Sequence, residues 1–206
     1  MKPEFGYTII IEINNFLISP AILIFTIQIF GIAVLIKKSI LLILPALDFN
    51  EQEYLTVYNS FTKTGFKVFI ASDANSLCVG KNGLKVKNDI SFFNMRDANF
   101  GALVFIGGSG VKKYWDNIHL HTLAKNFLLA KKIIGAICSA PVILGRAGLL
   151  KDIKATCYPE DKKELEREGA VYSDQPVVLS KKIITAQGPA VAMDFVNILI
   201  NELEKI

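Results

Sequence analysis

Cys138 stands at a point in the sequence where a nucleophile would be well placed. In the stretch KKIIGAICSAPVILGRAG (residues 131–148), an apolar run stops at Cys138, two small residues follow, and Pro141 precedes a second apolar run. A strand that turns sharply into a helix exposes the side chain at its turn, and proline suits the first turn of a helix. The helix amides would favour a thiolate and lower the pKa of the thiol. The competing interpretation is a buried structural cysteine, the common role of a lone cysteine in an apolar run.

The remaining cysteines and the histidines form no pattern typical of a disulfide framework or a metal site. Cys78, Cys138 and Cys157 are odd in number and lack CxxC spacing, which favours reduced thiols. His119 and His121 are two residues apart, so they would point to different sides of a helix, and we expect a solvated helix end. No histidine follows Cys138, so a Cys–His–Glu triad cannot be assembled near it from one chain. We therefore expect no metal and no cofactor.

The elements that must position Cys138 are short apolar runs alternating with helical segments. The sequence predicts strands at about residues 39–46, 66–72, 102–108 and 131–137, and helices at about 52–64, 119–130 and from 141. A shorter section follows, with a helix at 160–169, strands at 176–179 and 182–186, and a closing helix at about 189–204. This alternation indicates an α/β fold, a doubly wound and mostly parallel sheet with helices on both faces.

Three loops from separate parts of the sequence should meet at one edge of this sheet. FNEQE (49–53), IGGSG (106–110) and CSAP (138–141) each follow a predicted strand. Ligands of doubly wound sheets bind beyond the carboxyl ends of the strands. We therefore expect these loops to form a binding site around Cys138.

The motifs in these loops resemble those of the DJ-1/PfpI family. AICSAP (136–141) resembles its nucleophile motif, ALVFIGGSG (102–110) its strand and double-glycine loop, DFNEQE (48–53) its acidic segment, and IITAQGPAVAMDF (183–195) its closing segment. The matches occur in order over nearly all of residues 38–206. The resemblance implies a flavodoxin-like fold with a reactive cysteine on a nucleophile elbow, and assembly into homo-oligomers.

Carried over by position, the resemblance makes Cys138 the reactive thiol and Glu53 its carboxyl partner. Two like charges in contact disfavour each other, so Glu53 would tend to be protonated. It could then donate a hydrogen bond to sulfur and act as a general acid and base. Glu51 fits less well, because it lies off the final position of the motif.

The oxyanion hole and the pocket can be assigned in the same way. The backbone N–H groups of Gly107, Gly108 and Ser139 would stabilise a developing oxyanion. Ser139 replaces the histidine of protease-like members, and Tyr158 replaces a histidine of aldehyde-acting members. Both replacements weaken an assignment to either reaction. Cys157 is a structural thiol in the simplest interpretation, but it could line the pocket and resolve an oxidised cysteine.

Three functions are compatible with these residues. The first is thiolate addition to small reactive carbonyls, as the resemblance to glyoxalase- and deglycase-like members implies. The second is a membrane-tethered redox sensor or chaperone-like module without turnover, in which Cys138 is oxidised to a sulfinic acid. The third is an intracellular cysteine peptidase-like hydrolase, for which a partner chain would have to supply the histidine.

The amino-terminal segment predicts a membrane span before the α/β domain. Residues 16–36 form an uncharged stretch of 21 residues followed by two lysines, long enough to cross a bilayer as a helix. The lysines would place the following domain in the cytoplasm. We therefore predict a leader at 1–37, with the lipid bilayer as its partner, and a domain at 38–206. The alternatives are a buried helix, or a false start that would leave a cytoplasmic protein. The net charge of +4 comes partly from dispersed lysine pairs, a pattern that argues against nucleic-acid binding.

Overall fold

The computed structural model describes residues 12–13, 16–17, 25–26, 28–29, 31–32, 35–36 and 38–205. Contacts divide the chain into two units, residues 1–36 and 37–206. This boundary is one residue from the one that we predicted. The two units are described separately.

In the first unit, β1 (Glu12–Ile13) pairs antiparallel with β2 (Phe16–Leu17). The first two residues of the predicted span therefore belong to a strand, which corrects the expected start of that helix. Most of the predicted span lies outside the described residues, and among those described no helix is long and apolar enough to cross a bilayer. Membrane attachment and the cellular location of the domain stay predictions.

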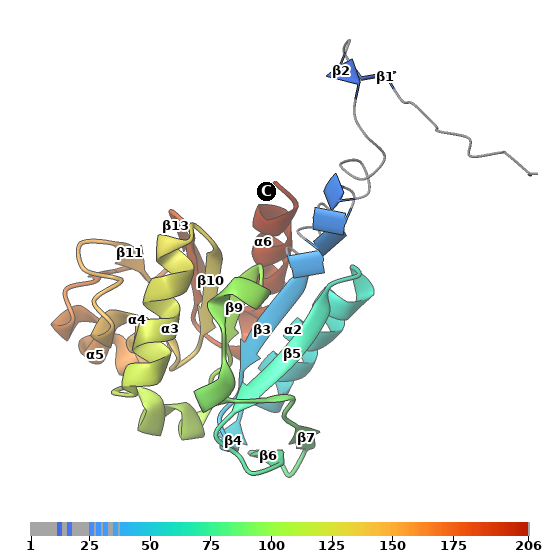
Figure 1. Cartoon of the computed structure of the whole chain (residues 1–206). Helices are drawn as coiled ribbons and strands as arrows, with labels where there is room; N and C mark the ends of the chain where they lie inside the picture. Colours follow the sequence, from blue (N-terminus) through green and yellow to red (C-terminus); the bar gives the residue numbers. More distant parts are fainter. Residues whose placement is uncertain are drawn as a thin grey trace, which may run out of the picture. The chain divides into compact units, whose positions relative to one another are not determined.

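The second unit is built on a seven-stranded sheet with the order β13-β14-β10-β9-β3-β5-β8, shown in Figure 1. Its strands are β3 (Ser39–Ile43), β5 (Lys67–Ser72), β8 (Ile90–Ser91), β9 (Ala102–Phe105), β10 (Ile133–Ile137), β13 (Val177–Ser180) and β14 (Ile183–Ala186). All neighbours are parallel except β13 and β14. The predicted α/β, mostly parallel sheet is confirmed.

Helices cover both faces of this sheet, and the strands are buried between them. The helices α2 (Glu51–Lys63) and α6 (Ala192–Glu204) cover one face. The other face carries α3 (Ile118–Leu129) and α4 (Pro141–Arg146), with α5 (Lys162–Arg167) packed on α4. Alternate residues of β3 enter the two hydrophobic clusters on opposite faces of the sheet. Burial on both faces explains why these strands are continuous apolar runs in the sequence.

Several short elements connect the main ones. A second sheet joins β4 (Leu47–Phe49), β6 (Leu77–Gly80) and β7 (Lys85–Lys87), and β11 (Lys154–Ala155) pairs with β12 (Val171–Tyr172). Single 3-10 turns occupy Phe92–Asn94, Asp97–Asn99, Ser109–Tyr114, Pro159–Asp161 and Pro189–Val191. These strands could not be predicted from the sequence, because two to four residues are too few to show a period.

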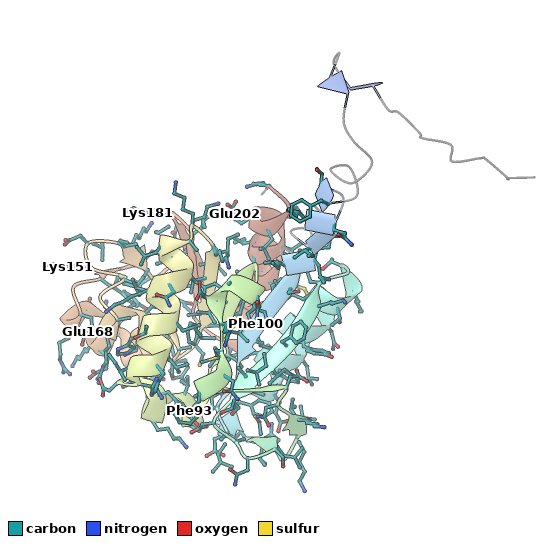
Figure 2. The ribbon with its side chains drawn as sticks, in the orientation of Figure 1. Phe93, Phe100, Lys151, Glu168, Lys181 and Glu202 are labelled. Carbon is teal, nitrogen blue, oxygen red and sulfur yellow. The ribbon has the colours of Figure 1, made fainter. Side chains whose placement is uncertain are left out.

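The sheet has a switch point at the carboxyl ends of its central strands. The chain leaves β3 toward β5 on one side, whereas it leaves the neighbouring strand β9 toward β10 on the other. In Figure 2 the carboxyl ends of the parallel strands lie on the side of Phe93, which follows β8. Lys181 and Glu202 lie at the opposite end of the sheet. A crevice outside such a switch point is the usual ligand site of this architecture.

Candidate active site

Cys138 occupies the turn between β10 and α4. Its φ is +63°, a left-handed conformation that costs a non-glycine residue on the order of 1–3 kcal/mol and that concentrates at functional sites. Two backbone hydrogen bonds hold the turn, from Cys138 N–H to Ala186 O at 2.9 Å and from Tyr158 N–H to Cys138 O at 2.8 Å. The Cys138 residue is 7% exposed. The thiol therefore lies at a strained turn that is buried but not sealed.

Glu53 comes from the first turn of α2, on the opposite face of the sheet from α4. Asn50 is the N-cap of this helix, and its side chain accepts a hydrogen bond from Glu53 N–H at 3.1 Å. In a capping box the glutamate side chain would return to the N-cap N–H. Here Oε2 of the carboxyl accepts from Gly107 N–H instead, at 3.0 Å, whereas Oε1 has no hydrogen-bond partner among the described residues and the carboxyl interacts electrostatically with the Cys138 thiol. Glu53 is fully buried.

The double-glycine loop after β9 brings these two side chains together. Asn50 N–H donates to Gly107 O at 3.0 Å, so Gly107 is bonded through both its N–H and its C=O to the start of α2. A Cβ on Gly107 would lie 2.4 Å from Cys138 Cβ. A Cβ on Gly108 would lie 2.3 Å from a carbonyl oxygen of β4, and its φ is +112°. Only glycine allows this close packing.

The oxyanion donors differ from those that the sequence predicts. Gly107 N–H is bonded to Glu53 and is not available to a substrate oxygen. The N–H groups of Gly108 and Ser139 instead face the Cys138 sulfur, where their hydrogen bonds favour the thiolate. The predicted set of three donors is therefore reduced to two.

The charges of the thiol and the carboxyl are coupled. Burial raises the pKa of Glu53 to about 7, although hydrogen bonds from Gly107 and Cys138 oppose the shift. Burial, followed by the negative charge of Glu53, raises the pKa of Cys138 to about 12, against the N–H groups of Gly108 and Ser139. This corrects the predicted lowering of the thiol pKa, because desolvation and a neighbouring carboxylate outweigh the amides of a six-residue helix. Above pH 7 the negative charge of the pair therefore lies on Glu53, and Cys138 keeps its proton.

A pocket of about 270 Å³ opens onto the sulfur. Its lining residues are Asn50, Lys81, Gly108, Ser109, Lys112, Cys138, Ser139, Tyr158 and Pro189. Tyr158 lines it, in agreement with the sequence prediction. Cys157 does not, because it is fully buried in the core on the α3 face, with its Sγ 3.3 Å from Tyr158 O. This corrects its assignment to the pocket.

Comparison with known proteins agrees with this geometry. Residues 38–202 match the model of the DJ-1/PfpI family. The chain belongs to this family. A glutathione-independent glyoxalase, DJR-1.2 of Caenorhabditis elegans, is 27% identical over 82% of the chain and 90% of its own length. The deglycase PH1704 of Pyrococcus horikoshii is 31% identical over 72% and 90%. The structure of a ThiJ/PfpI domain protein from Brachyspira murdochii superposes with a TM-score of 0.80, at 31% identity, over 82% of the chain and 98% of that protein.

Ser139 has a structural contact where the protease-like members of the DJ-1/PfpI family carry histidine. Its Oγ donates to Asp161 Oδ2 at 2.5 Å, and Lys112 Nζ lies 2.5 Å from Asp161 Oδ1. Trp115 Nε1 donates to Ser139 O at 2.9 Å. Asp161 is 2% exposed and was not identified from the sequence, because only the tertiary structure brings it to the turn after Cys138. These contacts fix the peptide whose N–H faces the sulfur.

Replacing Asp161 by alanine should destabilise this turn. The substitution leaves the Ser139 hydroxyl and the Lys112 ammonium without their acceptor, so we expect the free energy of unfolding to fall by roughly 2 kcal/mol. Urea denaturation followed by circular dichroism measures this change. Asp116→Ala is the control, because Asp116 is 78% exposed in its pair with Arg146 and such pairs contribute less than about 1 kcal/mol. Equal losses in the two variants would contradict the anchoring role of Asp161.

Neither histidine belongs to the site. His121 is buried on α3, where its Nε2 lies 2.7 Å from Trp115 O, which corrects the expectation of a solvated helix end. His119 is exposed in the first turn of α3, as expected, and its ring packs edge-on against Phe93. Neither histidine lines the pocket. Within the described part of the chain, no group of three or more His, Cys, Asp or Glu side chains could hold a metal ion.

Proposed function

We propose that this protein is a cysteine-dependent enzyme that acts on small reactive carbonyl compounds. The observation that carries the proposal is the fully buried Glu53 carboxyl beside the Cys138 thiol, with two backbone N–H groups directed at the sulfur. The pocket, at about 270 Å³, is large enough for a small molecule. The glyoxalase and deglycase names of two relatives support the same substrate class.

The geometry supports reversible addition of the thiol to an aldehyde. The S–H bond breaks as its proton passes to the Glu53 carboxylate, and a C–S bond forms between sulfur and the aldehyde carbon. The two electrons of the carbonyl π bond move to oxygen, where the N–H groups of Gly108 and Ser139 would stabilise the oxyanion. Glu53 then returns the proton to this oxygen, which gives a neutral hemithioacetal. No cofactor is needed for this step.

A 2-oxoaldehyde could continue to a stable product. Glu53 would take the proton from the former aldehyde carbon and return it to the adjacent carbon, by way of an enediol. The aldehyde carbon becomes a thioester while the ketone becomes an alcohol, so oxidation and reduction balance within the substrate. Water then cleaves the thioester, which releases a 2-hydroxy acid and restores the thiol.

The absence of histidine from the described pocket lining favours carbonyl addition over peptide hydrolysis. A departing amine must receive a proton, and histidine is the residue that most often supplies it. In aldehyde addition the thiol proton is the only proton transferred, and it passes through Glu53 to the former carbonyl oxygen. One carboxyl group is therefore sufficient.

The proposal predicts a specific pH dependence of turnover. Glu53 must be ionised to accept the thiol proton, and its pKa is raised to about 7. We therefore expect kcat/KM for methylglyoxal to rise about tenfold per pH unit below 7 and to level off above it. Loss of methylglyoxal, followed with the full chain between pH 5.5 and 8.5, measures this profile. A pH-independent rate would contradict the role of Glu53, and a rate equal to that of buffer would refute the proposed function.

A further inference from the structure

The pocket around Cys138 has an unbalanced charge. Two lysines, Lys81 and Lys112, contribute to its lining, and no Asp or Glu side chain is among the lining residues in the described part of the chain. Glu53 is fully buried and does not line the pocket, although it adds one negative charge near the sulfur when it is ionised. A pocket of about 270 Å³ with cations at its wall and a thiol at its base has the electrostatics of an anion site.

Lys81 is held at the pocket by contacts of its own turn. Its N–H donates to Phe49 O at 3.1 Å, just before α2 begins. Glu51, the first residue of α2, accepts through Oε1 from the N–H groups of Asn82 at 2.8 Å and Leu84 at 2.9 Å. A Cβ on Gly80 would lie 2.4 Å from this oxygen, so glycine is what lets Glu51 reach across the turn. The first turn of α2 thus positions both Glu53 and the hairpin that carries Lys81.

The two lysines differ in how far their charge is balanced. Lys112 is paired with Asp161 and stacks over the Trp115 ring at 5.1 Å from its centroid. Lys81 makes no ion pair with any described residue of the chain, and its residue is exposed. Of the nearby acids, Glu51 accepts through Oε1 from the N–H groups of the turn that carries Lys81, and Glu160 interacts with the Tyr158 side chain. The uncompensated positive charge at the pocket is therefore that of Lys81.

We propose that the substrate carbonyl compound carries an anionic group, a carboxylate or a phosphate, which Lys81 binds while the carbonyl carbon lies at Cys138. Glu51 acts as a positioning residue, because it fixes the turn on which Lys81 stands. This substrate class rests on the proposed function of the same site. The charge selectivity of the pocket does not rest on that function, because it concerns the access of any anion to the sulfur.

Two alkylating reagents of similar size test the charge selectivity directly. Iodoacetate is anionic and iodoacetamide is neutral, and both transfer a two-carbon group to Cys138 with loss of iodide. The ratio of their rates, measured on the full chain by peptide mapping and divided by the ratio for glutathione, cancels changes in thiol reactivity. We expect Lys81→Gln to lower this ratio about threefold or more at low salt. Lys87→Gln removes the same charge from β7 outside the pocket and should leave the ratio unchanged.

Glu51→Gln tests the positioning role in the same assay. Removing the Glu51 charge would by itself raise the normalised ratio, because the potential near the pocket becomes more positive. The substitution also weakens the hydrogen bonds that hold the turn, so a displaced Lys81 should make the ratio fall, as in Lys81→Gln, while the iodoacetamide rate stays within about twofold. Two results would overturn the inference. One is a normalised iodoacetate-to-iodoacetamide ratio near one in the unsubstituted protein, and the other is an equal normalised ratio in Lys81→Gln and Lys87→Gln.

Matched carbonyl pairs test the substrate class and identify the anion. Glyoxylate is compared with glyoxal, and glyceraldehyde 3-phosphate with glyceraldehyde, as protectants of Cys138 against iodoacetamide. We expect the charged member of at least one pair to protect at a concentration about threefold or more below its neutral counterpart, and Lys81→Gln to remove the difference. Equal protection within both pairs overturns the proposed class. If no carbonyl protects, the proposed function fails, while the alkylation ratio still decides the charge selectivity.

Discussion

Replacing Cys138 by alanine is expected to lower the turnover of methylglyoxal at least about a thousandfold, because no covalent adduct can form without the sulfur. Alanine keeps the Cβ that packs against Gly107 and can adopt the same strained φ as cysteine. The Gly108 and Ser139 N–H groups would then face an empty space, and Glu53 would have no proton to accept. Initial rates of methylglyoxal loss at pH 8, with enough protein to resolve a residual rate, measure the effect.

Cys78→Ala is the matched control for this experiment. Cys78 is fully buried in β6 and does not line the pocket, so its loss should affect stability and not turnover. Circular dichroism of both variants establishes that they are folded. A Cys138→Ala variant that retains a tenth or more of the rate would show that carbonyl loss does not proceed through this thiol.

Much of the fold could be predicted from the sequence because the central strands are buried on both faces. Runs such as residues 40–43 and 102–105 are uniformly apolar, and their sequence positions alternate with helices of recognisable period. The short strands of the second sheet have no such pattern. Leu77, for example, lies in β6 but is 47% exposed, and the apolar run at 77–79 is only three residues long, too short to indicate a strand.

The candidate site was predictable where a local motif determines it. Cys138 and Pro141 mark the turn from strand to helix, and the double glycine marks a close backbone approach. Contacts between distant segments were not predictable in the same way. Whether Gly107 N–H serves a substrate oxygen or Glu53 depends on where α2 begins relative to β9, and Lys81 reaches the pocket only through its hairpin.

The pKa of the thiol shows the limit of reasoning from one element. A helix amino terminus lowers the pKa of a cysteine when solvent reaches both. In this site the sulfur is buried beside a carboxyl that is fully buried itself, and each group penalises the charge of the other. The sequence could suggest the neighbours, but the sign of the shift depends on the depth of burial, which only the packed structure specifies.

Glu53→Gln should have opposite effects on activity and on stability. The amide can still accept from Gly107 N–H and can contact the sulfur, so the site keeps its shape. It cannot accept the thiol proton, and we expect kcat/KM for methylglyoxal at pH 8 to fall about a hundredfold or more. The rise of the rate through pH 7 should also disappear. Glu204→Gln, at the exposed end of α6, removes the same charge and should keep both the rate and its pH profile.

The stability of the same variant tests the electrostatic origin of these effects. In the folded protein the pKa of Glu53 is raised from 4.5 to about 7, so the folded state retains a proton that the unfolded state releases between these values. Stability of the unsubstituted protein should therefore fall as pH rises from 4.5 through 7, by roughly 3 kcal/mol for this group. Glutamine does not ionise, so urea unfolding should show Glu53→Gln to be more stable by about this amount at pH 8, with much less difference at pH 5. If the stability gained by Glu53→Gln over the unsubstituted protein is no larger at pH 8 than at pH 5, Glu53 is not desolvated beside the thiol. The raised carboxyl pKa on which the proposed pH dependence rests would then be absent.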